Sequence, residues 1–292
     1  MSLLQAILLG IVQGLTEFIP ISSTAHLVLA GRVMKLALTP EQLTASIAVI
    51  QLGTLVAVII YFAGDIWNIT RAFVHDHFVL LKEGRRDQFH RTNDHARLSH
   101  EAKLGWLVII GSLPVGVVGL IFKKQIEGAF TKNLWVIATM MVVIALLLAV
   151  AELVGKQRRR MQDLGIADAL AVGFAQCLAL IPGSSRSGST IMGGLFAGET
   201  RETAARFSFL LSMPAIAASG LLELKQALHV LPQGSLVTLA VGTIVSGIVG
   251  YASIWFLLRY LRTHTTGVFI VYRLLVGGAI LIMLFSGRIS PL

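Results

Sequence analysis

The stretch from residue 13 to residue 26 sets a carboxylate, an amide, hydroxyls and an imidazole inside otherwise apolar sequence. Gln13 and Glu17 are four residues apart, so on a helix they share one face. Their side-chain oxygens suit a hard divalent cation such as Mg²⁺ or Ca²⁺. A glutamine–glutamate pair that ties two helices together is the structural alternative.

Three hydroxyls and an imidazole follow the proline at position 20: Ser22, Ser23, Thr24 and His26. Helix capping explains one hydroxyl, because serine and threonine are favoured at helix N-caps. It leaves the other two and His26 without a role. A serine within reach of an imidazole is the minimal arrangement for an activated nucleophile.

A second polar stretch, from Gly183 to Thr190, reads Gly-Ser-Ser-Arg-Ser-Gly-Ser-Thr and places Arg186 among small residues. Small residues let backbone N–H groups approach a ligand, helix N-termini bind phosphate, and a guanidinium adds bidentate contacts. The two stretches together predict a phosphorylated substrate whose other end is apolar.

The composition indicates an integral membrane protein. Only 13% of the 292 residues are charged, against about 25% in a soluble globular chain, and the mean hydropathy is +0.79. The net charge of +9 is interpreted as cytoplasmic loops and contacts with anionic lipids rather than nucleic-acid binding. Cys177 is the single cysteine, which excludes an intrachain disulfide.

The elements that must position these residues are all helical. Six apolar stretches are long enough to cross a membrane, at about 43–63, 104–122, 134–154, 206–222, 235–258 and 267–286. Regions 3–34 and 166–198 are too long for one span, too short for two, and broken near their middle by proline, serine and glycine. Each is predicted to be a re-entrant helix–loop–helix whose loop is buried within the bundle. The prediction is a single all-α polytopic membrane domain over 1–292.

The two halves of the chain, about 1–155 and 156–292, share motifs in the same order. Ile19-Pro20-x-Ser22-Ser23 matches Ile181-Pro182-x-Ser184-Ser185, and Gly111-x4-Gly116 matches Gly242-x4-Gly247. Each half holds one re-entrant pair and three spans, so the second half enters from the opposite side. The sequence therefore predicts an inverted-topology repeat with its two polar loops near the bilayer midplane.

Basic residues set the predicted orientation. Segment 64–103 and the run 156–160 are rich in lysine and arginine and are predicted to be cytoplasmic, which places both termini outside. Five histidines between residues 75 and 100 could bind a metal, but their irregular spacing favours a solvated loop. Arg273, within the last span, is left with two readings, a structural partner or a substrate contact.

The sequence closely resembles the bacterial undecaprenyl-diphosphatase family, also called the bacitracin-resistance family. The motifs that carry the resemblance run through the chain: Gln13-x-x-x-Glu17, Pro20-x-Ser-Ser-Thr-x-His26, Ile50-Gln51-Leu-Gly53, Pro182-Gly-x-Ser-Arg-Ser-Gly188-x-Thr190, Phe207-Ser208-Phe209 and Tyr272-Arg273. The resemblance implies a hydrolase that converts undecaprenyl diphosphate to the monophosphate and inorganic phosphate. It further implies a multi-pass protein of the bacterial inner membrane that recycles the lipid carrier of peptidoglycan synthesis and confers bacitracin resistance. The site is expected to open to the periplasm.

The resemblance also implies roles for individual residues. Ser23 is the nucleophile and His26 its base or the acid for the leaving group, although the reverse assignment stays open. Glu17 and Gln13 hold the divalent cation or position water, and many members have glutamate where this chain has Gln13. Arg186 clamps the diphosphate. The expected diphosphate-binding residues are Ser22, Thr24, Ser184, Ser185, Arg186, Ser187, Gly188 and Thr190.

A transporter or lipid flippase is the rival interpretation, because inverted repeats with broken helices are typical of transporters. A pure carrier needs charge recognition but no serine and histidine beside the acid. Neither interpretation determines the oligomeric state, and a homodimer is compatible with both. The expected partners are a polyprenyl diphosphate and membrane lipids, with no nucleic acid.

Overall fold

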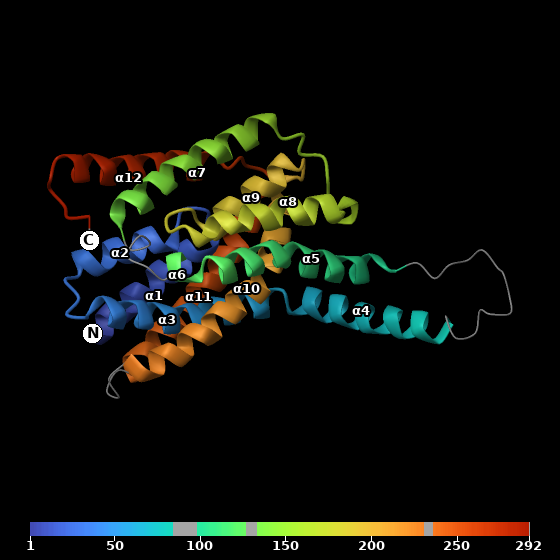
Figure 1. Ribbon diagram of the computed structural model, residues 1–292, viewed down its shortest axis with the longest axis horizontal. Coiled ribbons are helices and arrows are strands. Elements are labelled where there is room, and N and C mark those ends of the chain that lie inside the picture. Colours follow the sequence, from blue (N-terminus) through green and yellow to red (C-terminus); the bar gives the residue numbers. More distant parts are fainter. Residues whose placement is uncertain (84–97, 127–132, 231–235, 292) are drawn as a thin grey trace.

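The computed structural model describes residues 1–83, 98–126, 133–230 and 236–291, and these form a bundle of helices (Figure 1). Among the described residues, six helices are long and apolar enough to cross a membrane, so the protein is a multi-pass membrane protein. They are α3 (Pro40–Tyr61), α5 (His100–Ile121), α7 (Leu134–Val154), α10 (Arg201–Val230), α11 (Leu236–Leu261) and α12 (Gly267–Phe285). All six predicted spans are confirmed, with ends that differ by at most four residues except in α10, which begins five residues earlier and ends eight residues later than predicted.

Shorter helices occupy the two regions predicted to be re-entrant. The first holds α1 (Leu3–Phe18) and α2 (Ser23–Val33), and the second holds α8 (Ile166–Cys177) and α9 (Arg186–Phe196), preceded by a short 3₁₀ turn at Leu178–Leu180. In Figure 1, α1 enters the bundle from the end that carries both chain termini, whereas α8 enters from the opposite end. The breaks within both regions therefore lie where the sequence predicts them.

Equivalent contacts recur between the two halves. Helix α1 packs against α11, and α8 packs against α5. A Cβ on Gly10 would lie 2.4 Å from the carbonyl oxygen of Gly242, and one on Gly173 would lie 2.3 Å from that of Gly111, so neither pair tolerates a side chain. Since Gly111 and Gly242 also match in the sequence, this swapped pairing is the packing expected of an inverted repeat. The repeat and the re-entry into a membrane stay predictions.

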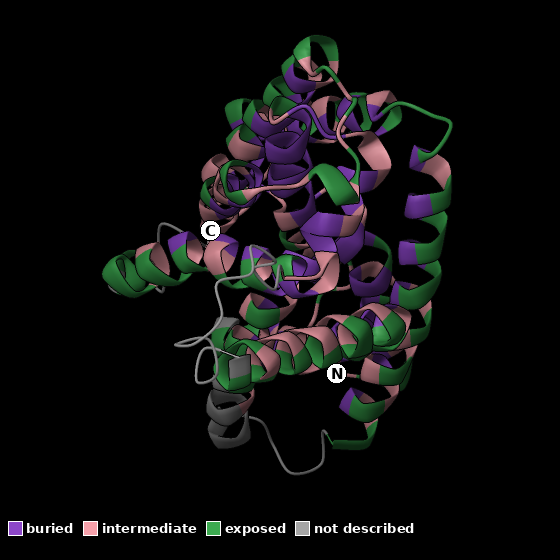
Figure 2. Cartoon of the chain, turned by 90° about the vertical axis from the view of Figure 1, so that its right-hand side faces the viewer, coloured by how far each residue is buried: buried purple, intermediate pink, exposed green. Residues whose placement is uncertain are grey.

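The core of the bundle is aromatic and aliphatic. The rings of Phe18 and Phe209 meet edge to face with centroids 5.4 Å apart, and Phe62 packs on Phe209 at 6.1 Å. Figure 2 shows buried residues gathered along the axis of the bundle and exposed residues on its outer face. Many exposed side chains are large and apolar, including Leu153 and Phe285, as a lipid-facing surface requires.

One sequence expectation is wrong in part. The sequence predicts a solvated loop over 64–103, but a helix, α4 (Ala63–Glu83), covers its first half. The His77 imidazole accepts a hydrogen bond of 3.0 Å from the Trp106 indole of α5, and the Phe73 ring stacks on His77 and packs against Trp106. Polar residues such as Asp65, Asn68 and Arg71 lower the average hydropathy of α4, so this average does not reveal the apolar seam. His90 and His95 lie outside the described residues.

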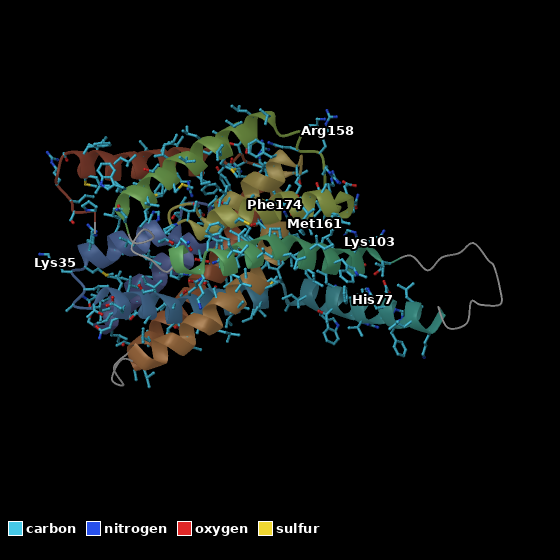
Figure 3. All side chains as sticks on the ribbon, in the orientation of Figure 1. Lys35, His77, Lys103, Arg158, Met161 and Phe174 are labelled. Carbon is cyan, nitrogen blue, oxygen red and sulfur yellow. The ribbon has the colours of Figure 1, made fainter. Side chains whose placement is uncertain are left out.

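Basic residues from distant parts of the chain lie at one end of the molecule. Lys103 and Arg158 lie near the end opposite Lys35 (Figure 3). The 155–160 segment is fixed there by backbone hydrogen bonds, from Arg158 to Gly198 at 2.9 Å and from Thr200 to Arg159 at 2.9 Å. The two basic segments of the chain thus share one face, as the positive-inside rule requires of loops on the same side.

A buried acid lies at this basic end, between α9 and α10. Glu199 is fully buried, and neither carboxyl oxygen has a hydrogen-bond partner. Burial, together with the nearby Asp168 carboxylate, raises the pKa of Glu199 to about 8, even though Arg159, which pairs with Asp168 at 2.8 Å, offsets part of the rise. Glu199 is therefore a neutral acid at pH 7.

The raised pKa of Glu199 predicts that the stability of the protein depends on pH. The folded protein holds this proton up to about pH 8, whereas the unfolded chain releases it near pH 4.5. The free energy of unfolding therefore falls as pH rises between these values, by about 1.4 kcal/mol per pH unit for one group. Glu199→Gln should flatten this slope in thermal unfolding of detergent-purified protein between pH 5 and pH 9.

Glu202→Gln is the matched control, since that carboxylate is partly exposed and pairs with Arg262 at 2.8 Å. It should leave the slope in place. An unchanged slope in Glu199→Gln would show that Glu199 is ionised at neutral pH.

Candidate functional site

Two serines with the same unusual backbone begin the second helix of each broken pair. Ser22 has φ 77° and ψ 97°, and Ser185 has φ 68° and ψ 119°. Left-handed φ values are uncommon for residues other than glycine and cluster at functional sites. Each hydroxyl caps its own helix, from Ala25 N–H to Ser22 at 3.4 Å and from Gly188 N–H to Ser185 at 3.2 Å. As helix caps, Ser22 and Ser185 are therefore equivalent residues of the two halves. The sequence match aligns Ser22 with Ser184 instead, one residue earlier.

The second break depends on Gly183. Its φ is +92°, and a Cβ there would lie 2.1 Å from the carbonyl oxygen of Ile137 on α7. Only glycine fits both the backbone conformation and the space. The loop that precedes Arg186 is therefore pressed against α7.

Arg273 joins the two loops. Its side chain is fully buried on α12, and its guanidinium donates to the carbonyl oxygens of five residues: Met141 at 3.1 Å, Pro20 at 3.3 Å, Met140 at 3.3 Å, Gly183 at 3.0 Å and Ser184 at 3.1 Å. Pro20 belongs to the first loop, and Gly183 and Ser184 to the second. The structural reading of Arg273 is thus the one that the geometry supports.

The first polar pair forms on α1 as its spacing predicts. Gln13 Nε2 donates to Glu17 Oε2 at 3.1 Å, and both side chains are buried. Arg186 Nη2 of α9 lies 4.0 Å from Glu17 Oε1. The Ser187 hydroxyl reaches the same segment, at 3.3 Å from the carbonyl oxygen of Ile19. Residues some 170 positions apart in the chain thus face each other.

Arg186 keeps an unused donor in this arrangement. Its Nη1 is buried and has no hydrogen-bond partner. A small cavity of about 10 Å³, roughly the room for one water, is lined by Glu17 and Arg186. A diphosphate needs more room, so a substrate-bound form must be wider here. The walls include Phe18, Phe209 and Ser212, which the sequence did not single out as site residues.

The expected Ser23–His26 pair is not formed. Ser23 begins α2, and no hydrogen bond joins its hydroxyl to the His26 imidazole. His26 Nδ1 instead lies 2.7 Å from the Ser22 carbonyl oxygen, and Nε2 lies 2.7 Å from the hydroxyl of Tyr272. The sequence motif contains Tyr272, but its role becomes visible only when α12 is placed beside α2.

The remaining predicted phosphate ligands have different environments. Thr24 is exposed at the start of α2, and Ser184 is buried with an unpartnered hydroxyl. Thr190 donates to the Arg186 carbonyl oxygen at 2.7 Å and contacts Ser208 of α10, so its hydroxyl serves packing between helices. The Gly188 N–H donates its hydrogen bond to the Ser185 hydroxyl. Of the eight expected ligands, Arg186 is the one that faces Glu17 with a free buried donor.

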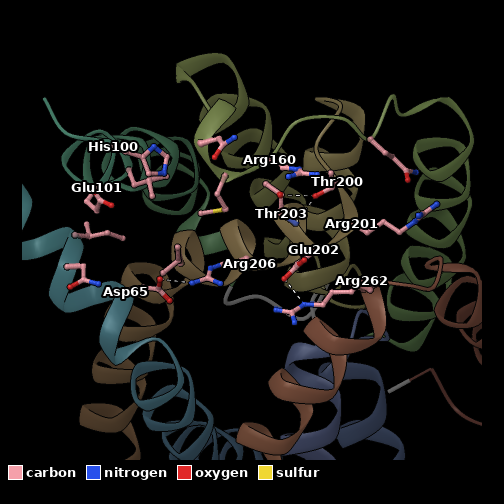
Figure 4. Close-up of a pocket in the computed structure, with 18 residues that line it drawn as sticks. Asp65, His100, Glu101, Arg160, Thr200, Arg201, Glu202, Thr203, Arg206 and Arg262 are labelled. Carbon is pink, nitrogen blue, oxygen red and sulfur yellow. Dashed lines mark hydrogen bonds and ion pairs between the residues drawn. The ribbon is translucent and has the colours of Figure 1, made fainter. Parts of the chain in front are cut away.

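A second, larger cavity of about 690 Å³ lies at the basic end, around the start of α10 (Figure 4). None of the predicted site residues lines it. Four of its charged residues form ion pairs with one another, Arg206 with Asp65 at 2.6 Å and Arg262 with Glu202 at 2.8 Å. The smaller cavity is the better candidate site, because unpaired buried donors and acceptors meet there.

The residues present offer a partial fit to a divalent cation. Gln13 Oε1 is buried and has no hydrogen-bond partner, and Glu17 Oε1 has only the long contact to Arg186. Two oxygens of these types suit Mg²⁺ or Ca²⁺, which take their other ligands from water or substrate phosphates. Within the described residues, no group of three or more His, Cys, Asp or Glu side chains could hold a metal. Such a cation would thus depend on the substrate for further ligands.

Comparison with known proteins covers almost the whole chain. The family described as Bacitracin resistance protein BacA matches residues 6–279, which include both loops and Tyr272-Arg273. The chain belongs to this family. It is 53% identical over 287 residues to an undecaprenyl-diphosphatase of Syntrophobacter fumaroxidans, with 98% of each chain covered. It is 46% identical to an undecaprenyl-diphosphatase of Chlorobium luteolum, with both chains fully covered, and 46% identical to one of Myxococcus xanthus, with 100% of this chain and 92% of the relative covered.

The family resemblance drawn from the sequence motifs is confirmed. The matched region contains every residue of the Glu17–Arg186 site. Family membership by itself assigns no role to a single residue.

Proposed function

We propose that this protein hydrolyses undecaprenyl diphosphate to undecaprenyl phosphate and inorganic phosphate. The observation that carries the proposal is Arg186, whose Nη2 lies 4.0 Å from Glu17 of the other half of the chain and whose Nη1 is buried without a hydrogen-bond partner. Relatives that match over the full length are named undecaprenyl-diphosphatase. An anion-binding guanidinium beside a carboxylate, within an apolar bundle, suits a diphosphate with a long lipid tail.

The reaction is a phosphoryl transfer, and the chain supplies positioning and charge. Arg186 binds the terminal phosphate and neutralises the charge that develops on it. The Ser23 hydroxyl attacks the terminal phosphorus, the bond from this phosphorus to the bridging oxygen breaks, and the lipid monophosphate leaves. His26 receives the serine proton. Water then releases inorganic phosphate and returns the proton to Ser23.

Gln13 and Glu17 would hold the divalent cation through the two oxygens described above. When bound, Mg²⁺ or Ca²⁺ would act as a Lewis acid on the diphosphate. Gln13 is neutral, so this chain should hold the cation less tightly than its Gln13→Glu variant, which adds a negative charge.

The wider proposal concerns location. The basic end of the bundle suits the cytoplasmic side, so the site would open to the periplasm and both termini would lie there. The two broken helix pairs would meet at the bilayer midplane as halves of an inverted repeat, supported by the swapped glycine contacts and by the matching caps at Ser22 and Ser185. In a bacterial inner membrane, such an enzyme would recycle the lipid carrier and give bacitracin resistance.

Phosphate release by detergent-purified protein tests the activity. Wild type should release phosphate from undecaprenyl diphosphate with Mg²⁺ or Ca²⁺ present, and EDTA should abolish the release. Ser23→Ala should lose most of it, because the nucleophile is gone.

Thr265→Ala is the control for Ser23→Ala. It removes an exposed hydroxyl between α11 and α12, outside the predicted site, and it should lower release by much less. If wild type releases no phosphate with either cation but moves the lipid across a vesicle bilayer, the rival transport function is correct. Full activity in EDTA would reject the cation.

A further inference from the structure

His26 is held through both ring nitrogens. Nδ1 lies 2.7 Å from the Ser22 carbonyl oxygen, which can only accept, so Nδ1 carries a hydrogen. In the neutral imidazole, the free lone pair is then on Nε2, and the Tyr272 hydroxyl, 2.7 Å away, donates to it. The two rings lie nearly parallel, 12° apart. The tautomer and the direction of the basic nitrogen are thus assigned by two neighbours.

The position of Tyr272 is fixed by its neighbour Arg273. It precedes Arg273 on α12, and the five carbonyl contacts of Arg273 fix this part of the helix against both loops. Arg273 is fully buried, whereas Tyr272 is 39% exposed. The helix therefore presents the tyrosine hydroxyl at the edge of the site, where it meets α2.

The same hydroxyl occupies the one lone pair with which neutral His26 could accept a proton. Ser23 and His26 are three residues apart and share a face of α2, yet the lone pair on Nε2 is already bound by Tyr272. A phenol that donates one hydrogen bond keeps lone pairs that can accept another. A proton can therefore reach the histidine base through the tyrosine oxygen without a direct bond between serine and histidine.

We infer that Tyr272 belongs to the proton path of the reaction and connects His26 to the attacking hydroxyl, an inference that rests on the proposed phosphatase function. As the Ser23 oxygen bonds to phosphorus, its proton passes to the Tyr272 oxygen while the Tyr272 proton moves to His26 Nε2. Tyrosine is neutral before and after, and the imidazole gains one proton and one positive charge. The reverse transfer restores both groups when water releases phosphate.

Kinetics of Tyr272→Phe provide the main test. Phenylalanine keeps the ring and removes the relay oxygen, so kcat should fall about 100-fold, the usual scale of positioned acid–base catalysis, with KM unchanged. Tyr251→Phe is the matched control, because Tyr251 is an exposed tyrosine on α11 whose ring packs on Tyr61. It should stay within twofold of wild type. A Tyr272→Phe protein with full kcat would overturn the inference.

A double-mutant cycle separates the relay from a direct substrate contact. If Tyr272 acts through His26, then Tyr272→Phe with His26→Ala should be no slower than His26→Ala alone. Losses that multiply, or a raised KM with an unchanged kcat, would show that Tyr272 acts on the substrate independently of His26.

Nitrogen NMR tests the hydrogen bond without any activity. In protein labelled at histidine, the His26 Nε2 resonance should shift in Tyr272→Phe, while Nδ1 keeps its hydrogen. An unshifted Nε2 would overturn the inference even in an active enzyme. A wild type without phosphatase activity would reject the proposed function, and the NMR result would still report on the Tyr272–His26 contact.

Discussion

Replacement of Arg273 by methionine is expected to abolish turnover and to lower the free energy of unfolding by at least about 4 kcal/mol. Methionine fills much of the space but donates no hydrogen bond, so five carbonyl oxygens lose a buried donor. Each unsatisfied buried acceptor costs about 1–3 kcal/mol, and relaxation of the loops recovers part of the total. Thermal unfolding in detergent, together with phosphate release, measures both effects.

Two further variants make this prediction specific. Arg273→Lys keeps the charge, but its ammonium group cannot donate to all five acceptors. The stability of this variant should therefore lie between that of Arg273→Met and that of wild type. Arg288→Met removes an exposed arginine just beyond α12 and should change stability by less than about 0.5 kcal/mol. An Arg273→Met protein with wild-type stability would mean that the two loops are held together by other contacts.

Arg186→Gln is expected to lower kcat/KM for undecaprenyl diphosphate by about 10³-fold while the protein stays folded. The guanidinium Nη1 has no partner in the structure, and the Glu17 contact is long at 4.0 Å. Its loss should therefore cost little stability, whereas the charge that neutralises the transferring phosphate disappears. Phosphate release at a series of substrate concentrations measures kcat/KM.

Arg158→Gln is the control for Arg186→Gln, because Arg158 is exposed at the far end of the molecule (Figure 3). It should leave kcat/KM within twofold. If Arg186→Gln keeps more than a tenth of the wild-type kcat/KM, Arg186 is not the phosphate clamp. If it unfolds instead, the 4.0 Å contact with Glu17 carries more stability than its length suggests.

Local pattern was enough for much of the fold. The span 134–154 was predicted at the bounds that α7 has, because hydropathy over about 20 residues depends only on neighbours in the chain. The break at Pro20 and the shared face of Gln13 and Glu17 follow from the same local rules. The α4 helix was missed because its apolar seam is narrow and becomes apparent only when Trp106 is placed against it.

The sequence by itself determined that this chain is a multi-pass membrane protein with two polar breaks, and it indicated which family motifs those breaks carry. Tertiary structure alone decided the pairings between them. Arg186 meets Glu17 and Arg273 binds both loops across separations of more than 80 residues. His26 turns to Tyr272 rather than to Ser23, three residues away. The physical reason is that helix periodicity orients a side chain on its own helix, whereas its partner depends on how distant helices pack.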